Sequence, residues 1–172
     1  MIRLLGLSFL LILSFSSCGL LQPISTDGGR TTTSRTRSGE SPSSGVRAVV
    51  VQEAQDLLGT RYKYGGNNPR EGFDCSGLTV WTFQQAGLNL PRTSRTQAVE
   101  GERVRENQAR PGDLVYFRRN GSVFHVALIT DVSSNEMWVI HSTSSRGVIR
   151  EDVLASSYWR PKIAGVRNVI GR

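Results

Sequence analysis

Three runs of strand-forming residues decide the fold of this chain: LVYF at 114–117, VFHVALITDV at 123–132 and MWVIHS at 137–142. Each run is rich in β-branched and aromatic residues, and polar turns separate one run from the next, which is typical of consecutive β-strands. Shorter candidates follow at 147–150 and 164–170. The second half of the chain is therefore predicted to form a meander of strands.

Upstream of this meander the apolar residues recur at helical spacing. The segments VRAVVVQEAQDLLG (46–59) and CSGLTVWTFQQAG (75–87) each carry an apolar stripe and end at a glycine, which predicts two helices. A turn-rich loop, 60–73, separates them, and a brief helix is expected around 96–100. Helices followed by antiparallel strands indicate an α+β fold in which the helices pack on one face of the sheet.

The amino terminus has the layout of an export signal. Arg3 precedes an apolar run and small residues, so residues 1–17 are predicted to be a signal peptide that is too short to span a membrane. Cys18 follows in a setting that resembles the lipobox of bacterial lipoproteins, which implies lipidation of its sulfur. The alternative is an ordinary signal peptide with Cys18 idle. Residues 18–45 are rich in Ser, Thr and Gly and are expected to form a flexible tether.

Length and charge restrict the class of protein. A chain of 172 residues suits one globular domain plus an appendage, which places the domain at 46–172. The formal net charge of +7 favours binding to polyanions such as anionic lipid head groups and cell-wall polymers. No nucleic-acid motif is present, so we expect no nucleic-acid partner, and we expect a monomer.

Cys75 is the strongest candidate for a catalytic residue. It has no disulfide partner once Cys18 is lipidated, and it falls in the first turn of a predicted helix, where backbone N–H groups favour a thiolate and lower its pKa. The chain has two histidines, His125 and His141, on neighbouring predicted strands. A thiol and an imidazole are the parts of a cysteine nucleophile with a general base. An inert buried cysteine is the alternative.

The register of the two histidine strands stays open at this point. A symmetric turn at Ser134 and Asn135 places His141 opposite Leu128, so that His125 points to the other face of the sheet. A one-residue bulge or an odd-length turn brings both histidines to one face.

An ordered set of motifs resembles the NlpC-type cell-wall peptidases, a papain-like family of cysteine enzymes. The motifs are YKYGG (62–66), FDCSGL (73–78), LPRTS (90–94), RPGDLVYF (110–117), FHVA (124–127) and IHS (140–142). Each motif is weak alone, and the ordered set covers nearly the whole globular part. The resemblance implies a papain-like α+β fold with N-terminal helices packed on an antiparallel sheet.

The resemblance also assigns the site. It implies Cys75 as nucleophile, His125 as base and His141 as the residue that orients the base. Tyr62 would assist the oxyanion together with the backbone N–H of Cys75 or Ser76. We also assign Asp74, which suits the helix N-cap, and Arg92, as a partner for substrate carboxylates, to the substrate or oxyanion side of the site.

The implied activity is hydrolysis of peptidoglycan stem peptides or crosslinks, at the bond from γ-D-glutamate or from D-alanine to diaminopimelate. No cofactor and no metal are expected, and the protein is expected in the cell envelope, anchored by lipid to a bacterial membrane, with the outer membrane preferred. Alternatives are an amidase or acyl transferase on the same scaffold, a non-catalytic wall-binding lipoprotein, and a zinc site at Cys75 and the two histidines.

Overall fold

The computed structural model describes residues 42–171. Its α-helices are α1 (Pro42–Asp56), α2 (Cys75–Gln85) and α3 (Ser94–Gln97). Its strands are β1 (Asn67–Asn68), β2 (Gly72–Phe73), β3 (Glu102–Val104), β4 (Leu114–Arg119), β5 (Ser122–Val132), β6 (Met137–Thr143), β7 (Gly147–Asp152) and β8 (Ile163–Asn168). Short 3-10 helices lie at Glu106–Gln108 and Arg160–Lys162.

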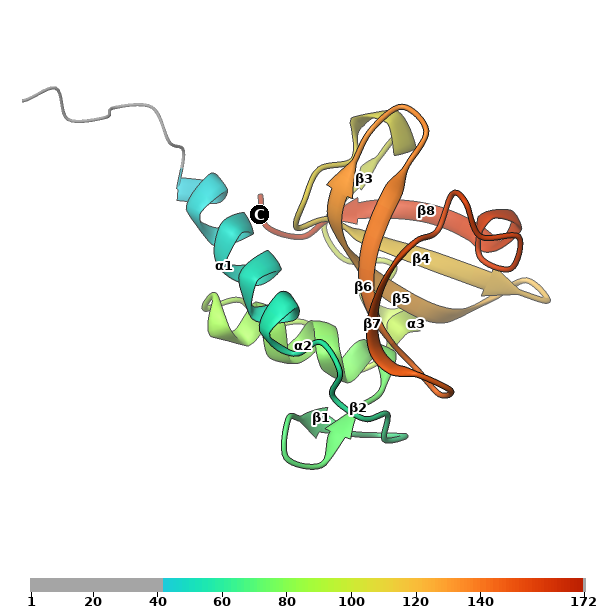
Figure 1. Cartoon of the computed structure of the whole chain (residues 1–172). Helices are drawn as coiled ribbons and strands as arrows, with labels where there is room; N and C mark the ends of the chain where they lie inside the picture. Colours follow the sequence, from blue (N-terminus) through green and yellow to red (C-terminus); the bar gives the residue numbers. More distant parts are fainter. Residues whose placement is uncertain (1–41, 172) are drawn as a thin grey trace, which may run out of the picture. The chain divides into compact units, whose positions relative to one another are not determined.

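Six strands form one antiparallel sheet in the order β3-β8-β4-β5-β6-β7 (Figure 1). The four consecutive strands β4 to β7 make the predicted meander, and β8 returns to pair with β4 on the other side. The α+β fold class expected from the sequence is confirmed. The turn-rich loop before α2 holds a small antiparallel pair, β1 and β2, that its composition did not predict.

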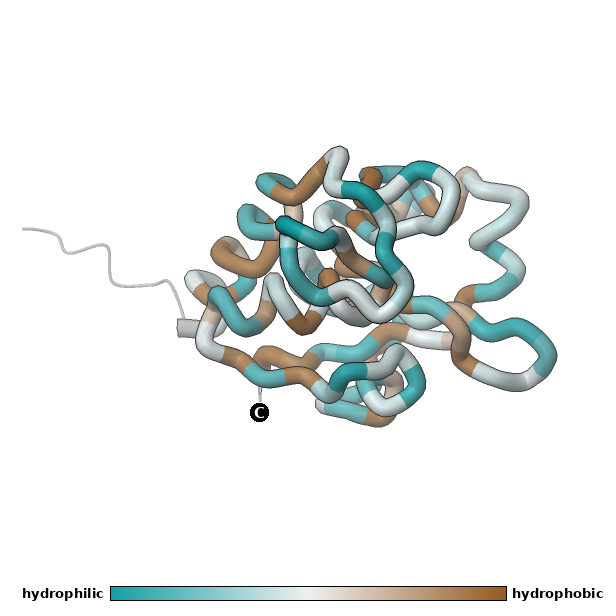
Figure 2. The backbone as a smooth tube through the Cα atoms, turned by 90° about the horizontal axis from the view of Figure 1, so that it is seen from below, coloured by the Kyte–Doolittle hydropathy of each residue, from teal (hydrophilic) through white to brown (hydrophobic). Residues whose placement is uncertain are grey.

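The sheet is packed on both faces. Leu114 and Tyr116 of β4 belong to a core shared with α1 and α2, whereas Val115 and Phe117 alternate to a second core on the opposite face. Trp159, in the segment between β7 and β8, closes that second core. Burial on both faces explains why LVYF and VALI are continuous apolar runs rather than alternating ones. Figure 2 shows the hydrophobic residues (brown) in helices and strands, while projecting loops are mostly teal or white.

Helix α1 begins at Pro42, earlier than the expected Val46. A proline suits the first helical position because its missing N–H needs no partner there and its φ angle is already helical. The part of residues 18–45 expected to be tether therefore ends earlier. Residues 1–41 lie outside the described residues, and with them the predicted signal peptide and Cys18. No helix within residues 42–171 has the length and apolar character needed to cross a membrane.

Candidate active site

Cys75 is the first residue of α2, as the sequence predicted. Asp74 caps the helix: its Oδ1 accepts a hydrogen bond of 2.7 Å from the backbone N–H of Gly77 and one of 3.2 Å from the Ser76 hydroxyl. Its Oδ2 accepts the backbone N–H of Gly65 at 3.0 Å. The carboxylate therefore fixes the helix start that carries the thiol, which is the N-cap role expected from the sequence.

Two glycines let the loop before α2 press against the helix. A Cβ added to Gly77 would lie 2.0 Å from the carbonyl oxygen of Gly66, and a Cβ added to Gly66 would lie 2.3 Å from that of Gly72. The same Gly66 carbonyl accepts the backbone N–H of Asp74 at 3.1 Å. The Gly-Gly and Cys-Ser-Gly motifs thus contact each other through their backbones at Gly66 and Gly77, and only residues without a side chain fit this contact.

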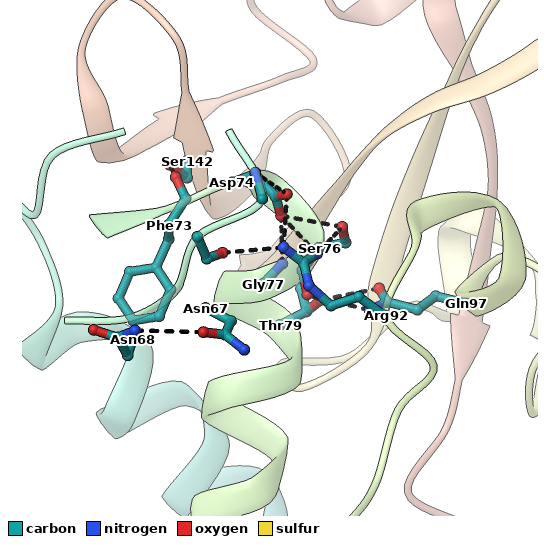
Figure 3. A network of polar contacts seen from close by, with 12 residues as sticks. Asn67, Asn68, Phe73, Asp74, Ser76, Gly77, Thr79, Arg92, Gln97 and Ser142 are labelled. Atoms are coloured by element: carbon teal, nitrogen blue, oxygen red, sulfur yellow. Dashed lines mark hydrogen bonds and ion pairs between the residues drawn. The ribbon is translucent and has the colours of Figure 1, made fainter. Parts of the chain in front are cut away.

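Arg92 binds the Asp74 carboxylate with both terminal nitrogens, at 3.0 Å and 2.8 Å (Figure 3). The same nitrogens reach the Ser76 hydroxyl at 3.0 Å and the Gly66 carbonyl at 3.2 Å. Burial raises the pKa of Asp74, but the hydrogen bonds from Arg92 and Gly77 outweigh it and hold that pKa below its usual value. The forked end of Arg92 is thus engaged within the protein, and its expected pairing with substrate carboxylates stays a prediction.

Two further side chains, Gln97 and Ser142, attach this region to the rest of the fold (Figure 3). The fully buried Gln97 of α3 accepts the Thr79 hydroxyl at 2.9 Å and donates to the Ser76 carbonyl at 3.3 Å, which ties α3 to α2. The Ser142 hydroxyl of β6 donates to the Phe73 carbonyl at 2.7 Å, which ties the residue before Asp74 to the sheet. The nucleophile's helix is therefore attached to the strand that carries His141.

A bulge decides the histidine register. Leu128 pairs with Ile140, but the register shifts between Ile129 and Asp131. This one-residue irregularity moves His141 onto the face that carries His125, which was one of the two registers left open by the sequence. The Nε2 atom of His125 lies 2.9 Å from the Nδ1 atom of His141.

The polar contacts continue beyond His141 to β7. The Nε2 atom of His141 lies 2.7 Å from Oε1 of Glu151, and the indole N–H of Trp159 donates to the same oxygen at 2.9 Å. Arg146 donates to both carboxylate oxygens at 3.1 Å. His125, His141 and Glu151 thus form a hydrogen-bonded line across three neighbouring strands.

The electrostatics of the thiol differ from the expectation. Burial raises the pKa of the Cys75 thiol above its usual 9.0, although backbone N–H groups of Val126, Ser76 and Cys75 itself favour the thiolate. The N–H groups at the start of α2 lower the pKa of the thiol, as predicted, but desolvation of the buried sulfur raises that pKa by more. The Val126 contact also places the sulfur against β5 at the residue that follows His125. At neutral pH Cys75 is therefore a thiol rather than a standing anion.

Burial lowers the pKa of His125 well below 6.5, and the neighbouring His141 lowers it further, while Glu151 acts in the opposite direction. His125 is therefore a neutral imidazole at neutral pH. The hydrogen bond from His141 lowers the pKa of Glu151 to about 2, and Arg146 adds to this effect, so Glu151 is ionised. A neutral thiol beside a strand that holds a neutral base suits proton transfer during attack.

Tyr62 lies within electrostatic reach of the thiol. Burial raises the pKa of its hydroxyl, and the charges of Cys75 and Asp74 add to this rise. Its backbone forms an isolated bridge with Phe73, which places it beside the segment that leads into α2. The structure thus gathers Tyr62 with Asp74, Cys75 and Arg92.

Sequence reasoning missed Glu151 and Trp159. The strand predicted at 147–150 ended one residue short of Glu151, and nothing in the local sequence relates position 159 to the histidines. Within residues 42–171 no group of three His, Cys, Asp or Glu side chains is placed to hold a metal. His125 and His141 direct ring nitrogens at each other, which does not suit the zinc alternative.

Comparisons with known proteins identify the family of this chain. The model of the NlpC/P60 family matches residues 59–168. The "Gamma-DL-glutamyl hydrolase" of Bacillus subtilis is 39% identical over 121 residues, which is 70% of this chain and 29% of that protein. The "Murein DD-endopeptidase MepS/Murein LD-carboxypeptidase" of Escherichia coli is 34% identical over 128 residues, 74% of this chain and 65% of that protein.

A solved structure described as similar to a lipoprotein of the NLP/P60 family, from Staphylococcus aureus, superposes with a TM-score of 0.64 at 32% identity, covering 74% of this chain and 42% of that one. An NlpC/P60 protein from Bacillus cereus gives a TM-score of 0.65 at 30% identity, covering 72% of this chain and 40% of that one. The chain thus spans less than two thirds of these relatives' lengths, while the family model covers more than half of the chain itself. On the motifs, the fold and these matches, the chain belongs to the NlpC/P60 family.

Proposed function

We propose that this protein is a cysteine endopeptidase that hydrolyses peptide bonds in peptidoglycan. The observation that carries the proposal is the polar line from His125 through His141 to Glu151, on strands next to a thiol that starts a helix. The backbone N–H of Val126, the neighbour of His125, favours the Cys75 thiolate, so nucleophile and base come from adjoining segments. One relative is named as a muramidase and DL-endopeptidase and another as a murein DD-endopeptidase, which supports the substrate class.

The reaction proceeds in two halves. Because both groups are neutral at rest, His125 takes the Cys75 proton as the sulfur attacks the peptide carbonyl, and a carbon–sulfur bond forms. The resulting imidazolium returns that proton to the leaving amine as the carbon–nitrogen bond breaks. Water then gives a proton to His125 while its oxygen attacks the thioester, and the carbon–sulfur bond breaks with return of the proton to sulfur.

The oxyanion formed in each half needs donors at the start of α2. The backbone N–H of Cys75 or Ser76 is available at the first turn of the helix, where such groups have no partner within the helix. Tyr62 is the side chain that would add a hydroxyl donor, since its charge couples to that of Cys75. Arg92 and Asp74 act on this site by holding the turn in place.

The proposed location is the cell envelope. The relative whose name refers to murein supports this location. The signal peptide at 1–17 and lipidation of Cys18 remain proposals, as do anchorage to the outer membrane and a monomeric state. Mass spectrometry of the membrane fraction tests the anchor: an N-terminal diacylglyceryl Cys18 is expected, and an unmodified chain would contradict it.

Digestion of purified peptidoglycan by the protein, with mass analysis of the fragments, tests the function. A Cys75→Ser variant is the matched control, because it changes one atom of the nucleophile. New peptide termini at the diaminopimelate bonds are expected for the wild type alone. Fragments from cleavage at the sugar–peptide amide would favour the amidase alternative, and equal digestion by Cys75→Ser would exclude the thiol mechanism.

A further inference from the structure

Glu151 has a position that the three-residue site does not explain. Its side chain is one-fifth exposed, and its Oε1 atom receives two donors from buried rings, His141 and Trp159. An ionised carboxylate has only acceptor sites, so the Nε2 atom of His141 must carry a hydrogen. For a His141 that carries a single hydrogen, this requirement fixes where the protons lie in the whole line.

The proton positions follow one from another. A neutral His141 with its hydrogen on Nε2 has a bare Nδ1, which can only accept. Its partner at 2.9 Å, Nε2 of His125, must then donate. A neutral His125 with its hydrogen on Nε2 has a bare Nδ1, and this is the nitrogen left for the Cys75 thiol. The opposite tautomer would put a hydrogen on Nδ1, where it could not accept a proton.

We infer that Glu151 is a positioning residue that selects the reactive tautomer of His125 through His141 and then stabilises the imidazolium formed during attack. The inference deepens the proposed function and depends on it. The three side chains lie on β5, β6 and β7, which are adjacent strands, so the line is set by the sheet rather than by a loop (Figure 1).

The groups around this line are few. His141 faces His125 from β5, Glu151 from β7 and the ring of Trp159 from the segment after β7. Glu151 also faces Arg146, which lies at the turn before β7. A second proton on His141 would reverse the hydrogen bond to His125 and place a hydrogen on Nδ1 of His125.

Two substitutions separate the two effects of Glu151. In Glu151→Gln the amide oxygen can still accept from His141 and Trp159, so the tautomer is kept and only the charge is lost. In Glu151→Ala the carboxylate is removed and both tautomers of His141 become available. We expect kcat to fall by about tenfold or more in Glu151→Gln, and further in Glu151→Ala, with KM nearly unchanged. Because Glu151 raises the pKa of His125, Glu151→Gln should also move the acid limb of kcat/KM to lower pH.

Imidazole ¹⁵N NMR of the full chain reads the tautomers directly, because the chain has only two histidines. At neutral pH both rings of the wild type should carry their hydrogen on Nε2, and Glu151→Ala should show an Nδ1–H fraction for His125. Glu136→Gln is the matched control, since Glu136 also accepts an indole N–H, from Trp138, but contacts no histidine. It should leave kinetics and tautomers unchanged.

Several outcomes would overturn the inference. A wild-type His125 with its hydrogen on Nδ1 would contradict it, and so would kcat and tautomers in Glu151→Ala that match the wild type. Circular dichroism checks that each variant folds. If Glu151→Ala does not fold, Glu151→Gln still tests the charge, because it preserves the shape of the side chain. The NMR measurement needs no substrate, so an inactive wild type with the expected tautomers would count against the proposed function and not against the role of Glu151.

Discussion

The ring of Trp159 lies over that of His125, with centroids 4.7 Å apart and planes inclined by 27°. Trp159 is itself 8% exposed, and its indole nitrogen is held by Glu151. The base of the proposed site is thus covered by a residue that also contacts the far end of the polar line. This arrangement explains how a histidine is kept neutral and oriented on a sheet surface.

Trp159→Ala should raise the pKa of His125. Burial is the largest cause that lowers this pKa, so removing the ring that covers the imidazole allows water to stabilise the charged form. Since His125 must be neutral to accept a proton, the acid limb of the kcat/KM profile should move to higher pH. Trp159→Phe keeps a ring over His125 and should move the limb less. An unchanged limb in Trp159→Ala would show that other groups bury the imidazole.

Alkylation of Cys75 by iodoacetamide should still accelerate above pH 9.0, because burial raises the pKa of the thiol above that value and the thiolate is the reactive form. Mass spectrometry of the peptide that contains Cys75 gives its rate separately from Cys18. A rate that levels off below neutral pH would instead indicate a standing thiolate, as the helix start alone would favour.

Arg92→Ala should lower kcat more than it raises KM. The guanidinium holds Asp74, Ser76 and the Gly66 carbonyl, so its loss loosens the turn that positions Cys75. The side chain is 37% exposed, so we expect a loss of about 1–2 kcal/mol in the free energy of unfolding, measured by urea denaturation. Arg92→Lys should recover little of the lost kcat or stability, since the compact ammonium of lysine cannot bind both carboxylate oxygens as the forked guanidinium does.

The exposed neighbour Arg95 provides the control for this prediction. Arg95→Ala should leave the free energy of unfolding and kcat nearly unchanged, because within residues 42–171 the hydrogen bond of its side chain is a long one, of 3.4 Å, to the Val123 carbonyl. A rise in KM without a change in kcat for Arg92→Ala would instead indicate that Arg92 binds substrate carboxylates.

Gly77→Ala should destabilise the protein by about 3 kcal/mol or more, because its Cβ would overlap the Gly66 carbonyl and push the loop away from α2. Gly45→Ala is a matched helical control: nothing lies within 4 Å of an added Cβ there, so the higher helix propensity of alanine should raise stability by up to about 1 kcal/mol. Thermal or urea unfolding compares the two. Equal stability of Gly77→Ala and wild type would contradict the close backbone contact.

The sequence by itself determined the order and type of the main elements. Apolar residues at helical spacing in α1 and α2, and runs of β-branched and aromatic residues in β4, β5 and β6, depend on neighbours within a few residues, so local patterns reveal them. The same holds for the position of Cys75 at a helix start, since Asp74 before it is a strong N-cap residue.

Only the tertiary structure decided how these pieces meet. The bulge near Thr130, the hydrogen bond between His141 and Glu151 and the packing of Trp159 on His125 depend on how separate strands and the segment after β7 are paired and packed. No local pattern encodes that pairing. The pKa of Cys75 was mispredicted for the same reason: the helix start is a local feature, but burial of the sulfur depends on the whole fold and outweighs it.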